Sequence, residues 1–168
     1  SIEANARMCM TSAVTGYFAS YGSDAPPTSY EDIEDADMIS FWGHNAREAH
    51  PVLFWRVADH KKQADIPTLV SDPRRTGTVQ GLENINPRNS THLATLNGDI
   101  SYLNAIAHVI LTKYPRAVMP DAWLSKNTNN HKEYIAGIKA RYSPEQVIKR
   151  LALLDKNRVT VEQIETVA

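Results

Sequence analysis

The sequence predicts an α/β fold: a three-layer, mainly parallel sheet of Rossmann-like type with a helical extension at its C-terminal side. Short apolar runs alternate with helical patterns along the first two thirds of the chain. Such alternation is typical of βαβ crossovers and parallel strands. From Pro115 onward every pattern is helical. We therefore expect a Rossmann-like region at residues 1–115 and a helical extension of the same domain at 116–168.

Composition places the chain among ordinary globular proteins. It has 168 residues, of which 42% are hydrophobic and 22% are charged, enough to bury one domain's core. The formal net charge of −1 gives no reason to expect a nucleic-acid partner. No apolar run approaches the roughly 18 residues of a membrane span. A single cysteine excludes an internal disulfide framework, and the sequence has no CxxC motif or Cys/His cluster of the kind that binds zinc or an iron–sulfur cluster.

The first part of the chain is expected to hold helices on either side of a strand. Residues 3–21 have a helical pattern, and Ser29 can cap a second, short helix with Asp32 at the capping-box position. The apolar run 38–43 ends in glycine and predicts a buried strand. An amphipathic helix follows it. Its core-facing residues are expected to be Val52, Leu53, Trp55 and Val57.

The second part continues the alternation before it becomes helical. Residues 66–72 predict a second strand, 81–91 are polar and predicted to be irregular, and 92–96 predict a third strand. A strongly apolar helix is expected over 100–114. The remaining helical patterns cover 121–127, 131–142, 143–154 and 159–168.

Three polar loops follow the predicted strands or begin the next helix. They are Gly43-His44-Asn45, residues 71–76, and Asn97-Gly98-Asp99. Ligands of parallel sheets bind beyond the carboxyl ends of the strands. We therefore expect the loops to converge on one edge and to form a nucleotide site that lacks a GxGxxG loop.

The side chains of these loops suit a nucleotide. Gly43 lets a backbone approach a ligand closely, and Asn45 can both donate and accept. The carboxylate of Asp72 can accept two hydrogen bonds from a guanine edge, while Arg74 and Arg75 can bind phosphate through their guanidinium groups. Asp99 can reach a guanine edge or simply cap the next helix. Ordinary turns with solvated side chains are the alternative at each loop.

Cys9 is the residue with the most distinctive chemistry. Its thiolate can bind a soft transition metal or act as a nucleophile. One thiolate cannot make a metal site by itself, and a single cysteine in an apolar helix is commonly an inert buried side chain. Among the histidines, His50 and His108 are expected to be structural, and His44 is given no catalytic role.

Taken together, four motifs resemble the molybdopterin oxidoreductases that carry a bis-guanylate molybdenum cofactor. Residues 7–14, with Cys9, resemble the segment whose cysteine or selenocysteine ligates molybdenum in this family. The loop from Gly43 to Pro51 resembles its G-x-N…H-P loop, and Asp72-Pro73-Arg74-Arg75-Thr76 resembles its D-P-R turn. Asn97-Gly98-Asp99 is similar to the loop before its next helix.

The resemblance implies a role for each motif. Cys9 would be the catalytic residue and the protein ligand to molybdenum, and the cofactor, bis-molybdopterin guanine dinucleotide, would supply the other sulfurs. The loops would hold one guanylate half of it. The residues expected to bind the cofactor are Gly43, Asn45, Ser71, Asp72, Arg74, Thr76, Gly98 and Asp99.

Among the members, the sequence is most similar to nitrate reductases. Formate dehydrogenases usually carry a histidine directly after the metal ligand, whereas this chain has Met10. The resemblance thus implies two-electron reduction of an oxyanion, nitrate first. Formate dehydrogenase or another oxyanion reductase is the alternative, and a non-catalytic nucleotide-binding module is the alternative of a different class. The segment 81–91 departs from the family pattern.

The resemblance also implies that the chain is a fragment of a larger enzyme. The family's 4Fe-4S domain and the domain that completes the cofactor clamp are not in this sequence, so the fragment alone is expected to be inactive. Its partners would be the remaining domains of the parent, an electron-transfer partner and a small oxyanion. No membrane segment is expected. The parent would be cytoplasmic or periplasmic, and the retained Asp72-Pro73-Arg74-Arg75 run favours the cytoplasm.

Overall fold

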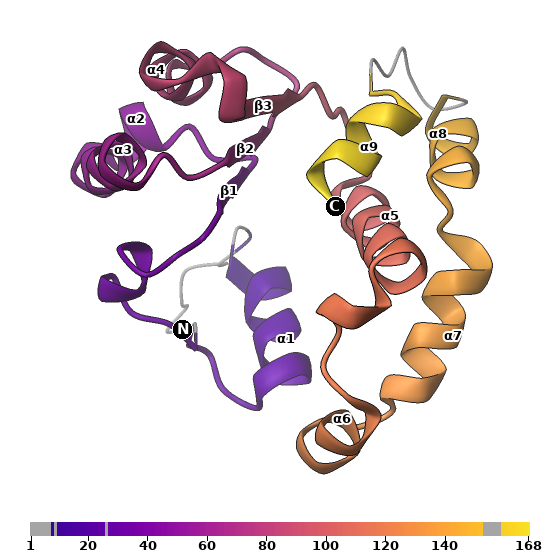
Figure 1. Ribbon diagram of the computed structural model, residues 1–168. Coiled ribbons are helices and arrows are strands. Elements are labelled where there is room, and N and C mark those ends of the chain that lie inside the picture. Colours follow the sequence, from indigo (N-terminus) through magenta and orange to yellow (C-terminus); the bar gives the residue numbers. More distant parts are fainter. Residues whose placement is uncertain (1–7, 9, 26, 153–158) are drawn as a thin grey trace, which may run out of the picture. The chain divides into compact units, whose positions relative to one another are not determined.

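The computed structural model describes residues 8, 10–25, 27–152 and 159–168 (Figure 1). The chain divides into two compact units, Ser1–Ala36 and Asp37–Ala168. In the first, α1 (Met10–Tyr21) accounts for most of the helix predicted at 3–21. Gly22 ends it with a φ of 71°, a left-handed conformation that glycine adopts without strain.

The short helix predicted after Ser29 is a single 3₁₀ turn, η1 (Glu31–Ile33). The backbone N–H of Ser29 donates to the Asp32 carboxylate at 2.5 Å, which is one half of the predicted capping box. Tyr30, rather than Ser29, occupies the cap position. The turn therefore ends without the reciprocal bond that would help to propagate an α-helix.

The second unit holds a parallel three-stranded sheet in the order β1-β2-β3. The strands are β1 (Ile39–Trp42), β2 (Thr68–Ser71) and β3 (Ser90–Leu93). Ile39 pairs with Thr68, and Thr68 pairs with Ser90. All four residues of the central strand are buried, as expected for a strand covered on both faces. The mixed α/β class with parallel strands is confirmed.

The segment between the second and third strands corrects the sequence prediction. Residues 81–91 are not irregular: α4 (Gly77–Ile85) and η2 (Pro87–Asn89) cover most of them. β3 therefore begins at Ser90, two residues before the predicted start. Thr78, Val79 and Leu82 are buried along one side of α4. A parallel pair of strands needs such a crossover helix.

The long helix after the first strand, α3 (Pro51–Ala64), turns a different face to the core than predicted. Val57 is buried as expected, but Val52 is 85% exposed and Trp55 is 52% exposed. The buried set is Phe54, Val57, Ala58 and Lys61, which follows the i, i+3, i+4, i+7 spacing of one helical face.

Lys61 occupies a core position because its ammonium group finds oxygen acceptors. Its Nζ donates to the Ile66 carbonyl at 3.0 Å, the Asn89 carbonyl at 3.2 Å and the Asn89 side-chain oxygen at 2.5 Å. Burial lowers the pKa of Lys61. The bonds tie the end of α3 to the segments that lead into β2 and β3.

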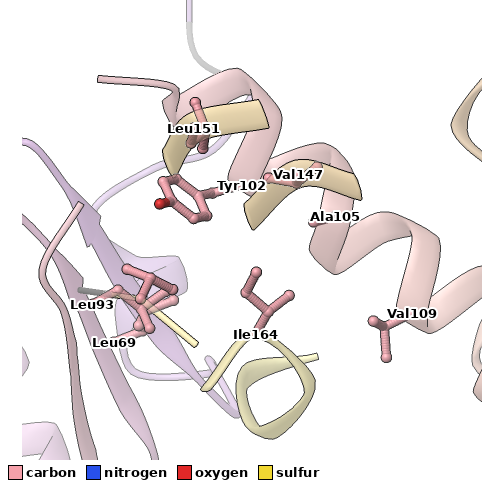
Figure 2. Close-up of a cluster of buried hydrophobic side chains, with 9 residues drawn as sticks. Leu69, Leu93, Tyr102, Ala105, Val109, Val147, Leu151 and Ile164 are labelled. Carbon is pink, nitrogen blue, oxygen red and sulfur yellow. The ribbon is translucent and has the colours of Figure 1, made fainter. Parts of the chain in front are cut away.

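Helices lie on both sides of the sheet (Figure 1). On one side are α2 (Ala46–Ala49), α3 and α4, and Phe54 of α3 lies against Gly81 of α4, where an added Cβ would be 2.6 Å from its ring. On the other side, Leu69 and Leu93 face a buried cluster (Figure 2). That cluster draws its residues from α5 (Asp99–Lys113), α8 (Pro144–Ala152) and α9 (Val161–Val167): Tyr102, Ala105, Val109, Val147, Leu151 and Ile164.

The chain after α5 is helical, as predicted. It forms η3 (Pro115–Ala117), α6 (Asp121–Asn127), α7 (His131–Arg141), α8 and α9. Thr160 and Gln163 form a complete capping box at the start of α9. Among the described residues, no helix is both long and apolar enough to cross a membrane.

Tyr102 is fully buried, yet its hydroxyl has no hydrogen-bond partner among the described residues. Removing an unpaired buried hydroxyl avoids its desolvation cost, whereas removing a paired one costs about 1 kcal/mol. We therefore expect Tyr102→Phe to leave the free energy of unfolding unchanged or raise it by up to about 1 kcal/mol. Urea denaturation would measure it, with exposed Tyr134→Phe as the matched control. A loss above about 1 kcal/mol would show that the hydroxyl is paired.

The same substitution should change the alkaline limit of stability. Burial, with a smaller contribution from Asp99, raises the pKa of Tyr102 to about 12. The unfolded chain titrates this group near pH 10. Because the folded state resists ionisation, wild-type stability should fall as pH rises from about 10 to about 12. Tyr102→Phe should lose less stability over that interval, as measured by denaturation at each pH. An identical decline in both proteins would contradict the burial of this phenol.

Candidate functional site

The loop after β1 begins with a glycine whose backbone conformation is left-handed. Gly43 has a φ of 58° and donates its N–H to the Ser71 carbonyl at 2.8 Å. A Cβ at this position would meet nothing within 4 Å. The glycine therefore serves the turn, and the space above it is open to a ligand.

Asn45 connects this loop to the start of α4. Its side-chain oxygen accepts from the Thr78 hydroxyl at 3.1 Å and from the Thr78 N–H at 3.3 Å. The backbone N–H of Arg47 donates in turn to the Thr78 hydroxyl at 3.0 Å. The first and second strand ends are thus brought together, as predicted, although the Asn45 oxygen is already used within the protein.

Asp72 follows β2 directly and shapes the turn that contains Arg74. It is 6% exposed, and its Oδ1 accepts from the Arg74 backbone N–H at 2.8 Å. The Arg74 Nε lies 3.9 Å from the same oxygen. His92 contacts the Asp72 carbonyl at 2.8 Å. The bond between the Asp72 carboxylate and the Arg74 N–H fixes the conformation of the loop. No described residue donates to the second carboxylate oxygen of Asp72.

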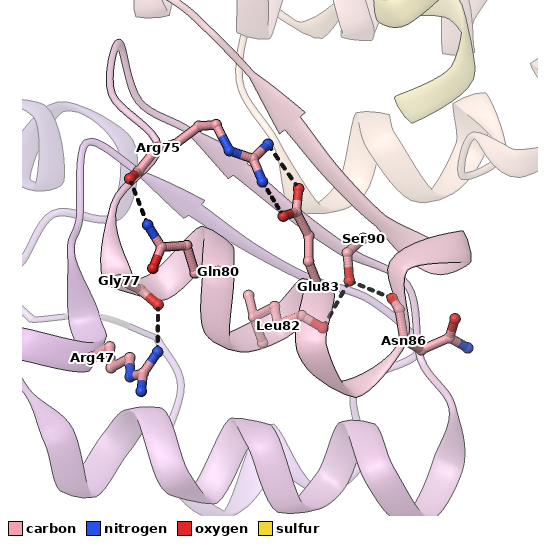
Figure 3. Close-up of polar contacts among 8 residues, drawn as sticks. All are labelled: Arg47, Arg75, Gly77, Gln80, Leu82, Glu83, Asn86 and Ser90. Carbon is pink, nitrogen blue, oxygen red and sulfur yellow. Dashed lines mark hydrogen bonds and ion pairs between the residues drawn. The ribbon is translucent and has the colours of Figure 1, made fainter.

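The two arginines of the loop have different roles. Arg75 forms a two-bond ion pair with Glu83 of α4, and its carbonyl accepts from Gln80 at 3.5 Å (Figure 3). The Arg74 side chain is 79% exposed, and among the described residues it has only its 3.9 Å contact with Asp72. Arg74 is therefore the cation of the pair that can still bind an anion.

Thr76 lies at the N-terminus of α4 and holds an unusual hydroxyl. The residue is 7% exposed, and its Oγ1 is buried without a partner among the described residues. It occupies the cap position, yet its side chain makes no capping bond. A buried hydroxyl without a partner costs roughly 1–3 kcal/mol. Because this hydroxyl lies among polar groups, we expect a bound ligand to supply its missing hydrogen-bond partner.

A cavity of about 300 Å³ lies at this helix start. It is lined by Asn45, Glu48, Arg74, Arg75, Thr76, Gly77 and Gln80. The positive end of the α4 dipole and the free guanidinium group favour anionic oxygen, such as phosphate. The carboxylate of Glu48 and the amide of Gln80 can bind hydroxyl or N–H groups. The cavity can thus hold an oxygen-rich, phosphate-bearing group, and it contains no evident nucleophile.

Three of the eight predicted cofactor-binding residues line this cavity, namely Asn45, Arg74 and Thr76. Gly43 and Asp72 shape the adjoining turns. Ser71 is fully buried, and its hydroxyl pairs with Thr95 at 2.7 Å, so it holds the strand end rather than facing the cavity.

The third predicted loop does not line this cavity. Gly98 has a φ of 92°, and a Cβ there would lie 2.7 Å from Leu151, so this glycine allows close helix packing. It also occupies the cap position of α5, which leaves Asp99 as the first helical residue. Asp99 is exposed. The alternative that Asp99 is the N-cap is therefore wrong.

The structure also reveals features that the sequence did not suggest. Glu48 and Gln80 line the cavity, and each lies one helical turn beyond a predicted loop residue. Their backbone N–H groups donate to the carbonyls of Asn45 and Thr76. The sequence signal that could have found them is their spacing of three and four residues from those predicted loop residues. His44 Nε2 contacts His50 Nδ1 at 2.7 Å. Burial, and then the neighbouring His50, lowers the pKa of His44.

The predicted metal ligand, Cys9, lies outside the described residues. The residues on either side of it are exposed: Met8 by 88% and Met10 by 43%. None of the described residues of α1 is buried within its unit.

Comparisons with known proteins agree with the motifs. The model of the molybdopterin oxidoreductase family matches residues 1–149. A nitrate reductase of Synechocystis is 34% identical over 170 residues, covering 100% of this chain and 21% of that protein. A nitrate reductase of Klebsiella oxytoca is 42% identical over 113 residues, covering 64% of the chain and 12% of that protein. A periplasmic nitrate reductase of Desulfovibrio desulfuricans is 37% identical over 115 residues, covering 67% and 14%.

The chain therefore spans about a fifth or less of the length of these relatives. The family match covers far more than half of the chain. With the loops that follow β1 and β2 and the cavity at the start of α4, it identifies this chain as a member of the molybdopterin oxidoreductase family.

Proposed function

We propose that this chain is the cofactor-binding part of a molybdenum oxidoreductase that reduces nitrate. The observation that carries the proposal is the polar cavity at the start of α4, in a chain that belongs to this family. Several relatives are named nitrate reductases. Met10, where formate dehydrogenases usually have histidine, favours nitrate over formate. The retained Asp72-Pro73-Arg74-Arg75 run supports a cytoplasmic enzyme.

The residues present fit one guanylate half of bis-molybdopterin guanine dinucleotide. The Thr76 hydroxyl lacks a partner that a phosphate oxygen would provide. Arg74 is free to neutralise a phosphate, and the α4 N-terminus adds positive potential. Asp72 and the exposed Asp99 have carboxylate oxygens that can accept the N–H groups of guanine. Gly43 and Gly98 have no side chain, so neighbouring groups can approach the backbone of these two loops closely. Asn45 and Ser71 hold the strand ends in place through their hydrogen bonds to Thr78 and Thr95.

Cys9 is proposed as the protein ligand of molybdenum. The bound cofactor would supply two-electron oxygen exchange with the oxyanion. The thiolate of Cys9 would complete a sulfur-rich ligand sphere, for which a soft donor is suited. A 4Fe-4S centre in another part of the parent would pass electrons from a redox partner. The remaining domains would cover the cofactor and extend the three-stranded sheet into a larger, three-layer Rossmann-like sheet.

The activity can be tested on the full-length enzyme that contains this chain. We expect purified enzyme to hold molybdenum and a guanine nucleotide and to oxidise a reduced viologen dye when nitrate is added. Formate with an oxidised dye, and other oxyanions with the reduced dye, form the comparison arms. Turnover with formate but not nitrate would replace the substrate assignment. Absence of molybdenum and nucleotide from active or folded enzyme would favour the non-catalytic module.

The isolated chain of 168 residues should purify without molybdenum. The cofactor in this family is proposed to lie between domains, and one part of the clamp leaves much of its surface in water. The entropic cost of immobilising a ligand stays the same when part of its contacts is lost. The binding free energy therefore falls by a larger fraction than the contacts do. Elemental analysis of the purified chain would measure this. Stoichiometric molybdenum in the isolated chain would contradict the shared clamp.

A further inference from the structure

Two imidazole rings converge on one point beside the loop after β1. His44 lies in that loop, and His50 lies at the junction of α2 and α3. His44 Nε2 and His50 Nδ1 are 2.7 Å apart. The ring centroids are 4.8 Å apart and the planes meet at 73°. At that distance one nitrogen donates a proton and the other accepts it, so both nitrogens point at a shared position.

The backbone holds this pair together. The N–H of His50 donates to the Ala46 carbonyl at 2.8 Å, which closes the short helix α2 between the two histidines. Phe41 of β1 lies against His44, with ring centroids 5.8 Å apart. His50 is the residue before Pro51, whose ring restricts the backbone conformation of that position. The two rings are therefore brought together by the fold and not by sequence spacing alone.

We propose that His44 and His50 form a two-imidazole binding site for a borderline divalent transition metal ion, with Zn²⁺ as the biological candidate. Neutral imidazole is a favoured ligand for this class of ion. Replacing the shared proton by Zn²⁺, with bonds of about 2.0–2.1 Å, would separate the two nitrogens to about 3.3 Å. The side chain of His50 is exposed and that of His44 is half-buried, so a small ring rotation provides that distance.

The site would be open to solvent. Within the described residues, no group of three histidine, cysteine, aspartate or glutamate side chains could hold a metal ion together. Water would complete the coordination, and the ion would exchange readily. A bound ion would cross-link the loop after β1 to the start of α3 and so stabilise this segment, residues 44–50, against unfolding.

The test uses the 168-residue chain with Cys9→Ser, which removes the competing thiol. Zn²⁺ is titrated calorimetrically in a non-chelating buffer at neutral pH. We expect one site per chain and a rise in melting temperature. His44→Ala and His50→Ala should each weaken binding roughly 100-fold, because each leaves a single imidazole without its chelating partner. His131→Ala is the matched control, since His131 also has a potential ligand nearby, the Asp121 carboxylate at 3.0 Å.

A second measurement keeps the test independent of the variants. Cu²⁺ binds imidazole sites more strongly than Zn²⁺ and broadens the proton signals of its ligands. Of the six histidines in the chain, substoichiometric Cu²⁺ should broaden the signals of His44 and His50 first. The proposal would be overturned if all six signals broadened equally, if calorimetry detected no binding, or if binding survived both alanine substitutions. Equal loss of affinity in His131→Ala would overturn it as well.

Discussion

Replacing Cys9 with alanine in the full-length enzyme should abolish nitrate reduction while leaving the fold nearly intact. A thiolate donates a soft, anionic sulfur, and alanine has no donor to replace it. Alanine lacks only the sulfur atom of cysteine, so the substitution should disturb little packing. Dye-linked nitrate turnover and circular dichroism, measured on the same preparations, would give the two results.

The control for this variant is Ser20→Ala in α1. Ser20 is exposed, lies near the end of α1 and follows Cys9 by eleven positions in the sequence. We expect it to retain wild-type turnover, which would show that a substitution in this part of the chain is tolerated. Cys9→Ala that turns over near the wild-type rate would remove Cys9 from the metal site and restore its interpretation as an inert side chain.

The second large effect concerns Asp72. Alanine at this position should strongly reduce the cofactor content of the full-length enzyme. It would remove the acceptors for two guanine N–H groups, at roughly 1.5–3 kcal/mol for each charge-assisted bond. Two such bonds correspond to a loss of about 10²–10⁴ in affinity. It would also release the Arg74 backbone N–H from its 2.8 Å bond and loosen the loop. Molybdenum and guanine nucleotide content per enzyme would measure the loss.

Asparagine separates the two contributions of Asp72. Its side-chain oxygen can still accept from the Arg74 N–H and keep the turn, but the charge and one acceptor are lost. We therefore expect Asp72→Asn to lower cofactor content less than Asp72→Ala. Asp59→Asn is the matched control, because Asp59 is an exposed acid of α3 that pairs with Lys62 at the surface. Cofactor content unchanged in both Asp72 variants would show that this loop is merely structural.

Two strands could be predicted because their apolar residues stand out between turn residues: Ile39, Phe41 and Trp42 in the first and Leu69 and Val70 in the second. β1 and β2 were expected within 38–43 and 66–72, and both lie there. β3 was misplaced because its first three residues, Ser90, Thr91 and His92, are polar and half-buried. A buried strand is recognised in a sequence by its apolar residues, and β3 has one only at its last position, the fully buried Leu93.

The helices on the α2–α4 side of the sheet were harder to predict, for a related reason. α4 contains Gly81, which lowers helix propensity, but the missing Cβ is what lets Phe54 pack closely. In α3 the buried face includes Lys61, whose cost is offset by the carbonyl acceptors of Ile66 and Asn89, both beyond the end of the helix. The helical pattern itself contains neither acceptor, so the sequence favoured Trp55 and Val52 instead.

Some features of the candidate site could likewise be predicted from the sequence, and others could not. Parallel strands end at one edge, so the meeting of Asn45 with the α4 start followed from the predicted topology. The unpaired Thr76 hydroxyl, the Arg75–Glu83 pair and the His44–His50 contact depend on side-chain geometry that spacing does not specify. Gly98 serves packing against Leu151, a residue more than fifty positions later, and that role could not be read from its loop.

A crystal or cryo-EM structure of the full-length enzyme with its bound cofactor tests the central claim most directly. We expect one guanylate half of the cofactor in the cavity at the start of α4. A phosphate oxygen should lie within hydrogen-bond distance of Thr76 Oγ1 and of the Arg74 guanidinium group, and the guanine N–H edge should face Asp72 or Asp99. Density for both guanylate halves elsewhere, with this cavity filled by water, would contradict it.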